Sequence, residues 1–598
     1  MMDFESVSPD LWSANEDEWK NKLLGLPNWC QIPLINCNAS HNLPDNTLVR
    51  FRGMIQDMHN PEFYFEQFEV YNSETNETKT KSGKYRDTAH ILKNEKINYT
   101  DNLKSSQRQP MVVVSLTGYN EWAQTIEEKE NHLKHLEEQP NSSKRLNNDS
   151  MNLKRSYDEA DDDPEAMDMV DESVANKEPK RVQNVQNNLS VVSREHLLNF
   201  PLPDVQSKSC IVKIYDESYN LKLNEMIEVV GFLSVDPALS GEFQSQTDPM
   251  FNPQLESEME TITHNPPPSL VPRIHAVYVK KLEHCNPLVK NFNQDEVLRT
   301  AESTREHLMK VFTELLFGDK LAAEYLICHL ISSVYLRDET LTLGQFSLNI
   351  TNVPTDTHPQ FTTQLYSIIQ KLVTNSYYLP LTIDNLNTLS FLPKKDYECD
   401  RLTSGLLQLC RGTHLVLDES RLQEGRLDRA GLEALGALRR AVSEQRAQYD
   451  FRYYTMDFPC DAPPLVLSEG TSLLNFKHYS INFHPIQLEQ RSPEMWSATL
   501  QAAAHYLSED VLRAVRTYLT CLKLVNYTVE PDVKFVQDDF VEMRRTRPAG
   551  AGDLHRLLVL ARLVALSRGG ASLSRAAWRH ALDMEEQRRR RTDTPRPQ

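Results

Sequence analysis

Runs of β-branched and aromatic residues in the first fifth of the chain predict short β-strands. Residues 49–55 (VRFRGMI), 63–71 (FYFEQFEVY) and 111–116 (MVVVSL) have this composition, which favours a pleated, half-buried surface. Turn residues separate the first two runs at Asp57–Pro61. We therefore expect residues 1–123 to hold an N-terminal region and the first part of a β-barrel.

Apolar patterning fails between residues 124 and 190, where Asn, Ser, Glu, Asp and Lys dominate. Nine of the fifteen residues from Asp158 to Glu172 are acidic. Such a segment cannot bury enough apolar surface to offset its chain entropy, so we predict a disordered acidic insert over residues 124–190. Basic pairs flank the acidic run, and they are either a weak nuclear-import signal or solvated charge: Lys144-Arg145, Lys154-Arg155 and Lys180-Arg181.

Strand patterns return after this insert, in residues 210–215, 221–233 and 273–280. Gly231 interrupts the second run, where a glycine suits a bend or a bulge. Strands on both sides of a long insert predict one small barrel of the OB type, with residues 191–290 supplying its remainder.

Helix and strand patterns alternate in the second half, which predicts a parallel α/β sheet with crossover helices. The clearest helix signal is the spacing of Phe361, Leu365, Ile368, Ile369 and Leu372, which share one helix face. The other expected helices are 321–336, 402–409, 432–448 and 553–566, and the expected strands are 341–350, 378–383, 414–417, 451–458 and 465–467.

These patterns define the fold class as multi-domain α/β, with an OB-like barrel followed by an α/β domain and C-terminal helices. We place the α/β domain at residues 291–480, the helical region at 481–585 and a basic tail at 586–598. The tail contains the run Arg588–Arg591. We expect this run to be solvated, and contact with nucleic acid or acidic protein is the alternative.

Composition narrows the functional classes. The 598 residues carry 65 Lys+Arg against 84 Asp+Glu, a net charge of −19, which argues against a surface built mainly to bind phosphates. Only 18 residues are glycine, so few loops allow close backbone approach to a nucleotide. The nine cysteines include no Cys-x-x-Cys pair and suggest reduced thiols. Without a signal peptide or an apolar span, we expect a soluble intracellular protein.

The strongest candidate for enzymatic chemistry is Asp418-Glu419, which follows the apolar run Leu415–Leu417. A short strand that ends in Asp-Glu has the form of a Walker B element, whose Asp holds Mg²⁺ and whose Glu polarises the attacking water. Such a site also requires a phosphate loop, with backbone N–H groups and a lysine directed at the phosphates.

The segment where that loop is expected, Thr351–Gln360, contains neither Gly nor Lys. No complete phosphate-loop motif occurs elsewhere, and Ser82–Tyr85 is only a fragment of one. We therefore interpret Asp418 and Glu419 as a Walker B-like remnant without activity, or as strand-end acids that are solvated or cap the next element. The sequence predicts a protein that is not an enzyme, with no catalytic, cofactor-binding or metal-binding residue.

Two further patterns are weaker. Glu283-His284-Cys285 has no additional ligands at zinc spacing, and we expect a surface loop there. A barrel-face platform for stacking bases is conceivable from five aromatic residues, but Glu62, Glu66 and Glu69 are interleaved with them and core packing accounts for them better. These aromatic residues are Phe51, Phe63, Tyr64, Phe65 and Phe68.

Several long phrases of the sequence carry a family resemblance. They are Val49–Tyr64, Gly83–Asp87, Lys395–Tyr397, Arg401–Leu409, Thr413–Glu419, Tyr449–Phe451, Met456–Cys460 and Ser468–Leu474. Together and in this order they resemble the mini-chromosome maintenance (MCM) complex-binding protein family. The stretch after Arg544 is not part of the resemblance.

The resemblance implies a nuclear protein that binds subunits of the MCM replicative helicase. It implies a role in disassembly or unloading of MCM from chromatin, or in subunit stability, during DNA replication, sister-chromatid cohesion and cell division. The implied layout is an OB-like region followed by a degenerate AAA+-like domain. Chromatin association would be indirect, without a membrane, a small-molecule substrate or a catalytic residue.

Two other functions stay open at the level of sequence. Asp418 and Glu419 motivate an AAA+-type ATPase with an atypical phosphate loop. Phe63 and Tyr64 motivate an OB-fold protein that binds single-stranded nucleic acid, although the net charge makes this the weaker alternative.

Overall fold

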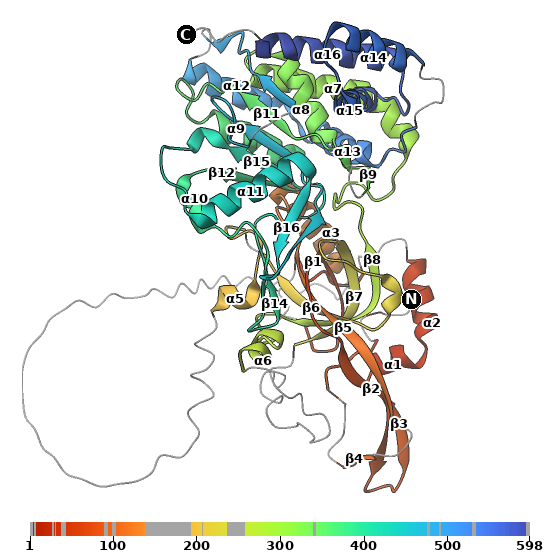
Figure 1. The fold of residues 1–598 in the computed structure, drawn as a ribbon. Coiled ribbons are helices and arrows are strands. Elements are labelled where there is room, and N and C mark those ends of the chain that lie inside the picture. Colours follow the sequence, from red (N-terminus) through yellow and green to blue (C-terminus); the bar gives the residue numbers. More distant parts are fainter. Residues whose placement is uncertain are drawn as a thin grey trace, which may run out of the picture.

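The computed structural model divides into a barrel-containing part and a helix-rich part that carries a parallel sheet (Figure 1). It describes residues 4, 7–26, 29, 31–37, 43–88, 94–98, 103–137, 193–205, 207–235, 258–338, 342–474, 479–488, 492–528 and 534–593. The acidic run 158–172 and the flanking basic pairs lie outside these ranges. No helix within them has the length and apolar character needed to span a bilayer.

Five strands of the first part close into a barrel, as the sequence predicts. They are β1 (Leu48–Met58), β5 (Lys104–Ser115), β6 (Ser209–Ile214), β7 (Met226–Ser234) and β8 (Arg273–Lys281). The order β1-β7-β8-β6-β5 closes through a β1–β5 pairing, and the β6–β8 pair alone among these is parallel. Register shifts between Val230 and Gly231, which confirms the bulge expected there.

Glycine at position 231 has a steric reason. A Cβ atom there would lie 2.4 Å from the carbonyl oxygen of His275 on β8, so only glycine allows the two backbones to approach this closely. Outside the barrel, helices α1 (Pro9–Ala14) and α2 (Glu16–Gly25) cover the β7 side, where Trp12 packs edge-on against Phe232. Strands β2 (Glu62–Asn72), β3 (Thr78–Ser82) and β4 (Glu95–Asn98) form an arm that projects from the barrel (Figure 1).

The predicted start of the disordered insert at residue 124 is wrong, because helix α3 (Glu121–Glu137) continues through it. The helix is held largely by polar contacts, which explains why apolar patterning did not reveal it. Glu127 pairs with Arg52, and Asn131 accepts a hydrogen bond from Arg50 at 3.3 Å. Arg50 also pairs with Glu228 at 3.0 Å, and both are almost fully buried.

The second part contains a five-stranded sheet in which every pairing is parallel, as predicted. Its order is β12-β15-β18-β11-β19. The strands are β11 (Leu348–Thr351), β12 (Ser376–Pro380), β15 (His414–Asp418), β18 (Pro464–Leu467) and β19 (Tyr479–Asn482). Residue alternation directs successive side chains to opposite faces, so that Leu415 and Leu417 join one apolar cluster and Val416 joins another.

Helices cover both faces of this sheet. The face of Val416 packs against a large cluster that includes α7 (Gln294–Leu315), α8 (Lys320–Ile331), α9 (Phe361–Leu372) and α15 (Ala551–Ser567). The face of Leu417 packs against α10 (Ile383–Thr388) and α11 (Arg429–Glu444). The result is a three-layer α/β/α unit, and α9 begins and ends with the residues that its spacing predicted.

Two predicted elements are wrong. Residues 404–409, expected in a helix, form a turn after β14 (Arg401–Thr403), where a Cβ atom at Gly405 would lie 2.4 Å from the Leu392 carbonyl carbon. Residues 451–454, expected within a strand, form the turn of a hairpin between β16 (Arg446–Asp450) and β17 (Thr455–Pro459). These strands complete a small sheet, in the order β14-β13-β16-β17, with β13 (Lys394–Asp396).

The arginine run near the C-terminus lies in a docked helix and is not a solvated tail. The other C-terminal helices are α12 (Pro493–Tyr506), α13 (Glu509–Leu524) and α14 (Lys534–Thr546). Helix α16 (Arg575–Asp593) packs along β19, where Arg588 donates to the Ser480 carbonyl at 2.9 Å. Arg591 forms a two-pronged pair, at 2.7 and 3.0 Å, with the fully buried Asp319 that caps α8. Because these partners lie far from the arginine run in the sequence, the run alone did not reveal that it is docked.

The two parts are joined by hydrogen bonds around the start of β12. The segment after β5 runs beside the segment before β12, with Gly118 accepting a hydrogen bond from the Ser376 amide at 2.8 Å. The Asn120 side chain donates to the Val373 carbonyl at 2.8 Å, and the Asn375 side chain donates to the Thr117 carbonyl at 3.0 Å. These buried bonds couple the barrel to the edge of the parallel sheet.

Candidate functional site

Asp418 lies at the carboxyl end of β15, where ligands bind in open parallel sheets. β15 pairs with β12 on one side and with β18 on the other. The Asp418 side chain is fully buried. The predicted strand therefore places its acid at the edge of the sheet where parallel sheets bind ligands.

The carboxylate of Asp418 is already saturated by neighbouring protein groups. Thr362 donates its hydroxyl to Oδ2 at 2.7 Å, and the Tyr378 hydroxyl also donates to Oδ2. Ser420 donates its backbone N–H and its hydroxyl to Oδ1, at 3.0 and 2.6 Å. The Nε atom of Arg421 lies 3.6 Å from Oδ2 of Asp418. With both oxygens engaged inside the protein, this acid has no free position for a hydrated Mg²⁺ ion.

The loop between β11 and α9 does not present a row of backbone N–H groups to a phosphate. Residues Pro354 and Pro359 lack an N–H. The Thr355 amide donates to the Val353 carbonyl at 3.0 Å, and the His358 amide donates to the Pro354 carbonyl at 2.9 Å. These donors are used within the loop, so the anion cradle of a phosphate loop is missing here.

Aromatic side chains fill the space beside this loop. His358 is buried, with its ring 5.1 Å from that of Phe317. Phe317 stacks on Trp496 at 4.5 Å, and Phe361, the first residue of α9, packs against the same indole at 5.6 Å. The chain thus uses apolar packing where a nucleotide-binding protein uses a polar, accessible loop.

Glu419 is also held by its own chain. Its carboxylate accepts a hydrogen bond from the Ser472 hydroxyl at 2.8 Å, and burial raises its pKa. Next to it, Arg421 donates to the Pro359 carbonyl at 2.8 Å and ties the strand end to the loop. Of the two structural alternatives, solvated acids or a cap, the cap is confirmed for Asp418, which caps the short helix Glu419–Arg421, whereas Glu419 is partly exposed.

Sequence reasoning missed the partners of these acids. Thr362 stands at the start of the helix that follows β11, where a phosphate loop places its metal-binding hydroxyl. That position was the available signal. Tyr378 and Ser472 come from distant parts of the chain, and one sequence alone does not reveal that they converge.

The aromatic residues of the barrel do not share one face. Phe51 and Phe68 are buried, whereas Phe63 is 64% exposed. Tyr64 packs edge-on against Tyr215 at 5.1 Å, under the guanidinium of Arg108. The predicted core packing accounts for two of the five, and no common stacking platform results.

One group of side chains in the described residues has the composition of a metal site. Glu260, His264 and Asp400 place possible ligand atoms within 4.8 Å of one another. Asp400, however, already pairs with Lys395 at 2.7 Å and accepts a hydrogen bond from Asn60 at 2.9 Å. Both of its oxygens are occupied by protein groups, so the trio serves as a polar contact between the two parts. The Glu283-His284-Cys285 segment likewise is not a ligand cluster, because the buried Cys285 thiol donates to Asn375 at 2.7 Å.

Fold and site together define a multidomain protein in which a β-barrel is joined to a parallel α/β unit with a closed strand-end site. In comparisons with known proteins, nearly the whole chain matches one family. A family described as "Mini-chromosome maintenance replisome factor" matches residues 19–592, and the chain belongs to this family.

Curated relatives extend this result. The chain is 37% identical to the mini-chromosome maintenance complex-binding protein of Drosophila melanogaster, with 99% of this chain and 97% of the relative covered. It is 38% identical to the protein of that name from Danio rerio and 36% identical to that from Homo sapiens, each with 98% of this chain and 94% of the relative covered. The resemblance found in the sequence is therefore confirmed.

Proposed function

We propose that this protein binds subunits of the MCM helicase complex through protein–protein contacts and catalyses no reaction itself. The names of its relatives supply the partner. The absence of catalysis is inferred from the carboxylate of Asp418, whose oxygens both accept hydrogen bonds from protein groups. The backbone amides of the neighbouring loop likewise donate to carbonyls of the same loop.

The strand orders of both parts support a helicase-subunit-like layout. Numbered along the chain, the parallel sheet has the order 2-3-4-1-5, the arrangement found in AAA+ cores. The barrel contains one parallel pair, β6–β8, closes through the β1–β5 pairing and has long segments inserted between its strands, features of an OB-type barrel. We infer an OB-like region and a degenerate AAA+-like domain.

This layout suggests a mechanism. A domain shaped like a helicase core competes for the surface where one MCM subunit meets its neighbour. Because its strand end is filled by Thr362, Tyr378 and Ser420, the substituted contact lacks a bridging nucleotide and holds less firmly. We propose that this weakening supports unloading of MCM from chromatin or protects free subunits, and thereby supports replication and cohesion in the nucleus.

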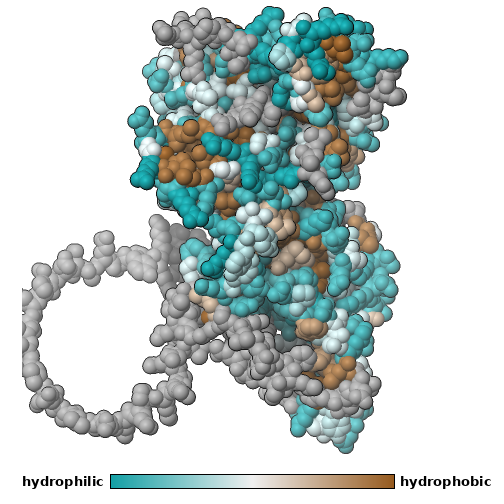
Figure 2. Space-filling view, in the orientation of Figure 1, coloured by the Kyte–Doolittle hydropathy of each residue, from teal (hydrophilic) through white to brown (hydrophobic). Residues whose placement is uncertain are grey.

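The surface of the α/β part offers material for such contacts. Figure 2 shows a largely hydrophilic surface with a hydrophobic area on this part, close to α10. Separately, the exposed large apolar side chains of the α/β part include Leu432 on α11, which is 61% exposed, and Leu473, which is 44% exposed. Contiguous exposed apolar surface is a common mark of protein–protein contact.

Binding of the purified full chain to each MCM subunit by biolayer interferometry tests the proposal. We expect saturable binding to at least one subunit, both with and without Mg-ATP. Absence of binding to every subunit would overturn it. Recovery of the chain in the nuclear fraction tests the proposed location, and an exclusively cytoplasmic signal would contradict it.

The two alternatives have distinct signatures. An ATPase would bind Mg-ATP and lose hydrolysis on Glu419→Gln, whereas we expect no nucleotide-dependent shift in melting temperature. A single-strand binder would show affinity that falls steeply with salt and weakens on Phe63→Ala. Phe63 is the one strongly exposed residue among the five aromatic residues of the expected platform, so this variant is the sharpest test of that alternative.

A further inference from the structure

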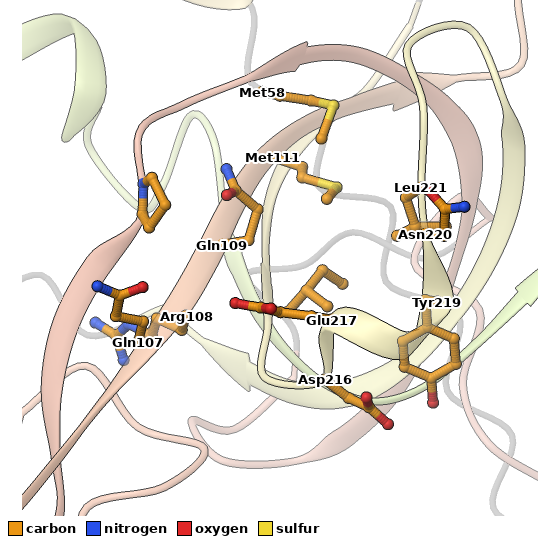
Figure 3. Close-up of a pocket in the computed structure, with 12 residues that line it drawn as sticks. Met58, Gln107, Arg108, Gln109, Met111, Asp216, Glu217, Tyr219, Asn220 and Leu221 are labelled. Carbon is orange, nitrogen blue, oxygen red and sulfur yellow. The ribbon is translucent and has the colours of Figure 1, made fainter.

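A small pocket opens on the barrel (Figure 3). Its volume is about 190 Å³. The end of β1 and the turn after it supply Met58 and Pro61, and β5 supplies residues 107–109 and Met111. The end of β6 and the connection to β7 supply Ile214, residues 216 and 217, and residues 219–221. Three segments far apart in the chain therefore meet around one hollow.

The pocket combines an apolar wall with one central acid. Met58, Met111 and Leu221 line it, and methionine side chains adapt their shape to what they contact. Figure 3 shows the Glu217 side chain reaching into the middle of the lining residues, whereas the Asp216 carboxylate points away. Asp216 is used locally, because it accepts a hydrogen bond from the Ser218 amide at 2.9 Å.

The cationic residue that lines the pocket, Arg108, is already paired with other groups. Arg108 lines the pocket, but its guanidinium pairs with Glu62 at 2.9 Å and donates to the Arg86 carbonyl at 2.7 Å and to the Tyr215 hydroxyl at 3.2 Å. Across the described ranges, Glu217 is exposed and takes part in no salt bridge. Of the two acids that line the pocket, Glu217 therefore presents its carboxylate above the apolar wall without a paired cation, whereas Asp216 points away.

Size excludes most ligands. Pockets that hold a cofactor or a drug-sized molecule measure about 300–1,000 Å³, so this hollow is too small for a nucleotide. One long amino-acid side chain fits it. Lysine and arginine bury an apolar stem while keeping a charged head near water or an acid, and a charge-assisted bond to a carboxylate is among the stronger polar contacts.

We propose that this pocket receives one lysine or arginine side chain of a protein partner. The stem lies along Met58, Met111 and Leu221, and the ammonium or guanidinium head pairs with Glu217. The assignment of that partner as an MCM subunit rests on the proposed function, whereas the pocket chemistry does not. Anchors of this kind, buried in a pocket at an interface, carry much of the binding energy.

The first experiment tests the pocket with small probes on the full chain. Saturation-transfer NMR would compare n-butylguanidinium and n-butylammonium with the neutral n-butyramide. We expect the two cations to bind and the amide not to bind, with cation binding weakened at least about fivefold by Glu217→Gln. Equal binding of cations and amide, or cation binding unchanged in the variant, would overturn the proposal. Glu494→Gln, an exposed acid on α12, is the matched control.

The second experiment uses the MCM subunits that bind the wild-type chain. We expect Glu217→Gln to weaken binding about tenfold and Glu217→Arg to weaken it further, with a reduced salt dependence. Glu494→Gln should leave affinity unchanged, and equal melting temperatures would show intact folding. If the wild type binds and Glu217→Arg binds equally well, the partner assignment of the pocket is wrong. If the wild type binds no subunit, the proposed function fails and the small probes alone decide the pocket.

Discussion

Asp418 lies at a closed strand end and Glu217 lines an open pocket, and the surroundings of these two acids are opposite. Asp418 accepts hydrogen bonds from Thr362, Tyr378 and Ser420 and is fully buried. Glu217 is exposed, and its salt-bridge partner is missing from the described part of the chain. The first acid has the position of a catalytic residue and the environment of a structural one. The second belongs to no catalytic motif but is available to a partner.

The contrast shows that the position of an acid in the fold says less about its role than whether its carboxylate oxygens are free to accept further hydrogen bonds. An acid whose oxygens are all engaged contributes to stability, because replacing it leaves buried donors without acceptors. An acid with free oxygens contributes little to stability and can contribute to binding. The comparison therefore makes opposite predictions for substitutions at the two places.

The largest effect is expected for Asp418→Ala. The substitution leaves the hydroxyls of Thr362 and Tyr378 and the Ser420 amide without their shared acceptor in a buried site. We expect the free energy of unfolding to fall by about 3–5 kcal/mol, measured by urea denaturation. Glu217→Ala is the matched control and should change it by less than about 0.5 kcal/mol. Similar effects for the two would remove the basis of the comparison.

A second large effect separates two neighbouring arginines of α16. Arg591 pairs with the fully buried Asp319, which also caps α8 and accepts the His484 amide at 2.9 Å. Arg591→Ala leaves that buried carboxylate without its cationic partner, and we expect the free energy of unfolding to fall by about 2–4 kcal/mol. Arg590 is 75% exposed, so Arg590→Ala should cost less than about 0.5 kcal/mol. Equal melting temperatures for the two variants would show that the arginine run is solvated after all.

Acid pH provides an intermediate effect. Burial lowers the pKa of His59 to about 3 and that of His329 to about 4. Between these values and about 6.5 the unfolded chain binds a proton that the folded chain does not. Stability is therefore lost as pH falls below about 6.5, by up to about 1.4 kcal/mol per pH unit for each histidine.

Urea titrations at pH 7.5 and 5.5 measure this loss. In His329→Gln the slope between these pH values should be shallower by the share of one histidine. An unchanged slope would show that His329 gains its proton in the folded state as readily as in the unfolded state.

The smallest effect is expected for Glu419→Gln. The amide oxygen of glutamine can still accept the Ser472 hydroxyl, and the substitution removes a partly buried charge whose pKa is raised. We expect a change in stability below about 1 kcal/mol and no change in MCM binding, measured by thermal denaturation and interferometry. A loss of binding restored by Mg-ATP would instead point to a nucleotide-dependent role.

Elements with strong local signals could be predicted from the sequence. The five apolar residues of α9 lie on one face at helical spacing, and the strands around Val49, Val113 and Leu415 are β-branched or apolar runs. Each such element is specified by its own residues. Helix α3 was missed because a hydrogen bond from Arg50 and an ion pair with Arg52 hold it, and those partners lie far away in sequence.

For the candidate site, the sequence predicted which phosphate-binding residues are missing more readily than it predicted the contacts that are present. The missing glycine and lysine of Thr351–Gln360 already argued against phosphate binding. The hydrogen bonds that close the site come from α9, β12 and the end of β15, and they depend on the order of strands in the sheet. The Glu217 pocket likewise joins three distant segments, so neither constellation is visible before the chain is folded.

Equilibrium binding of the purified full chain to individual MCM subunits, measured by biolayer interferometry with and without Mg-ATP, tests the central claim most directly. The account predicts saturable binding to at least one subunit with the same affinity in both conditions. Absence of binding to every subunit, or binding that requires Mg-ATP, would contradict it.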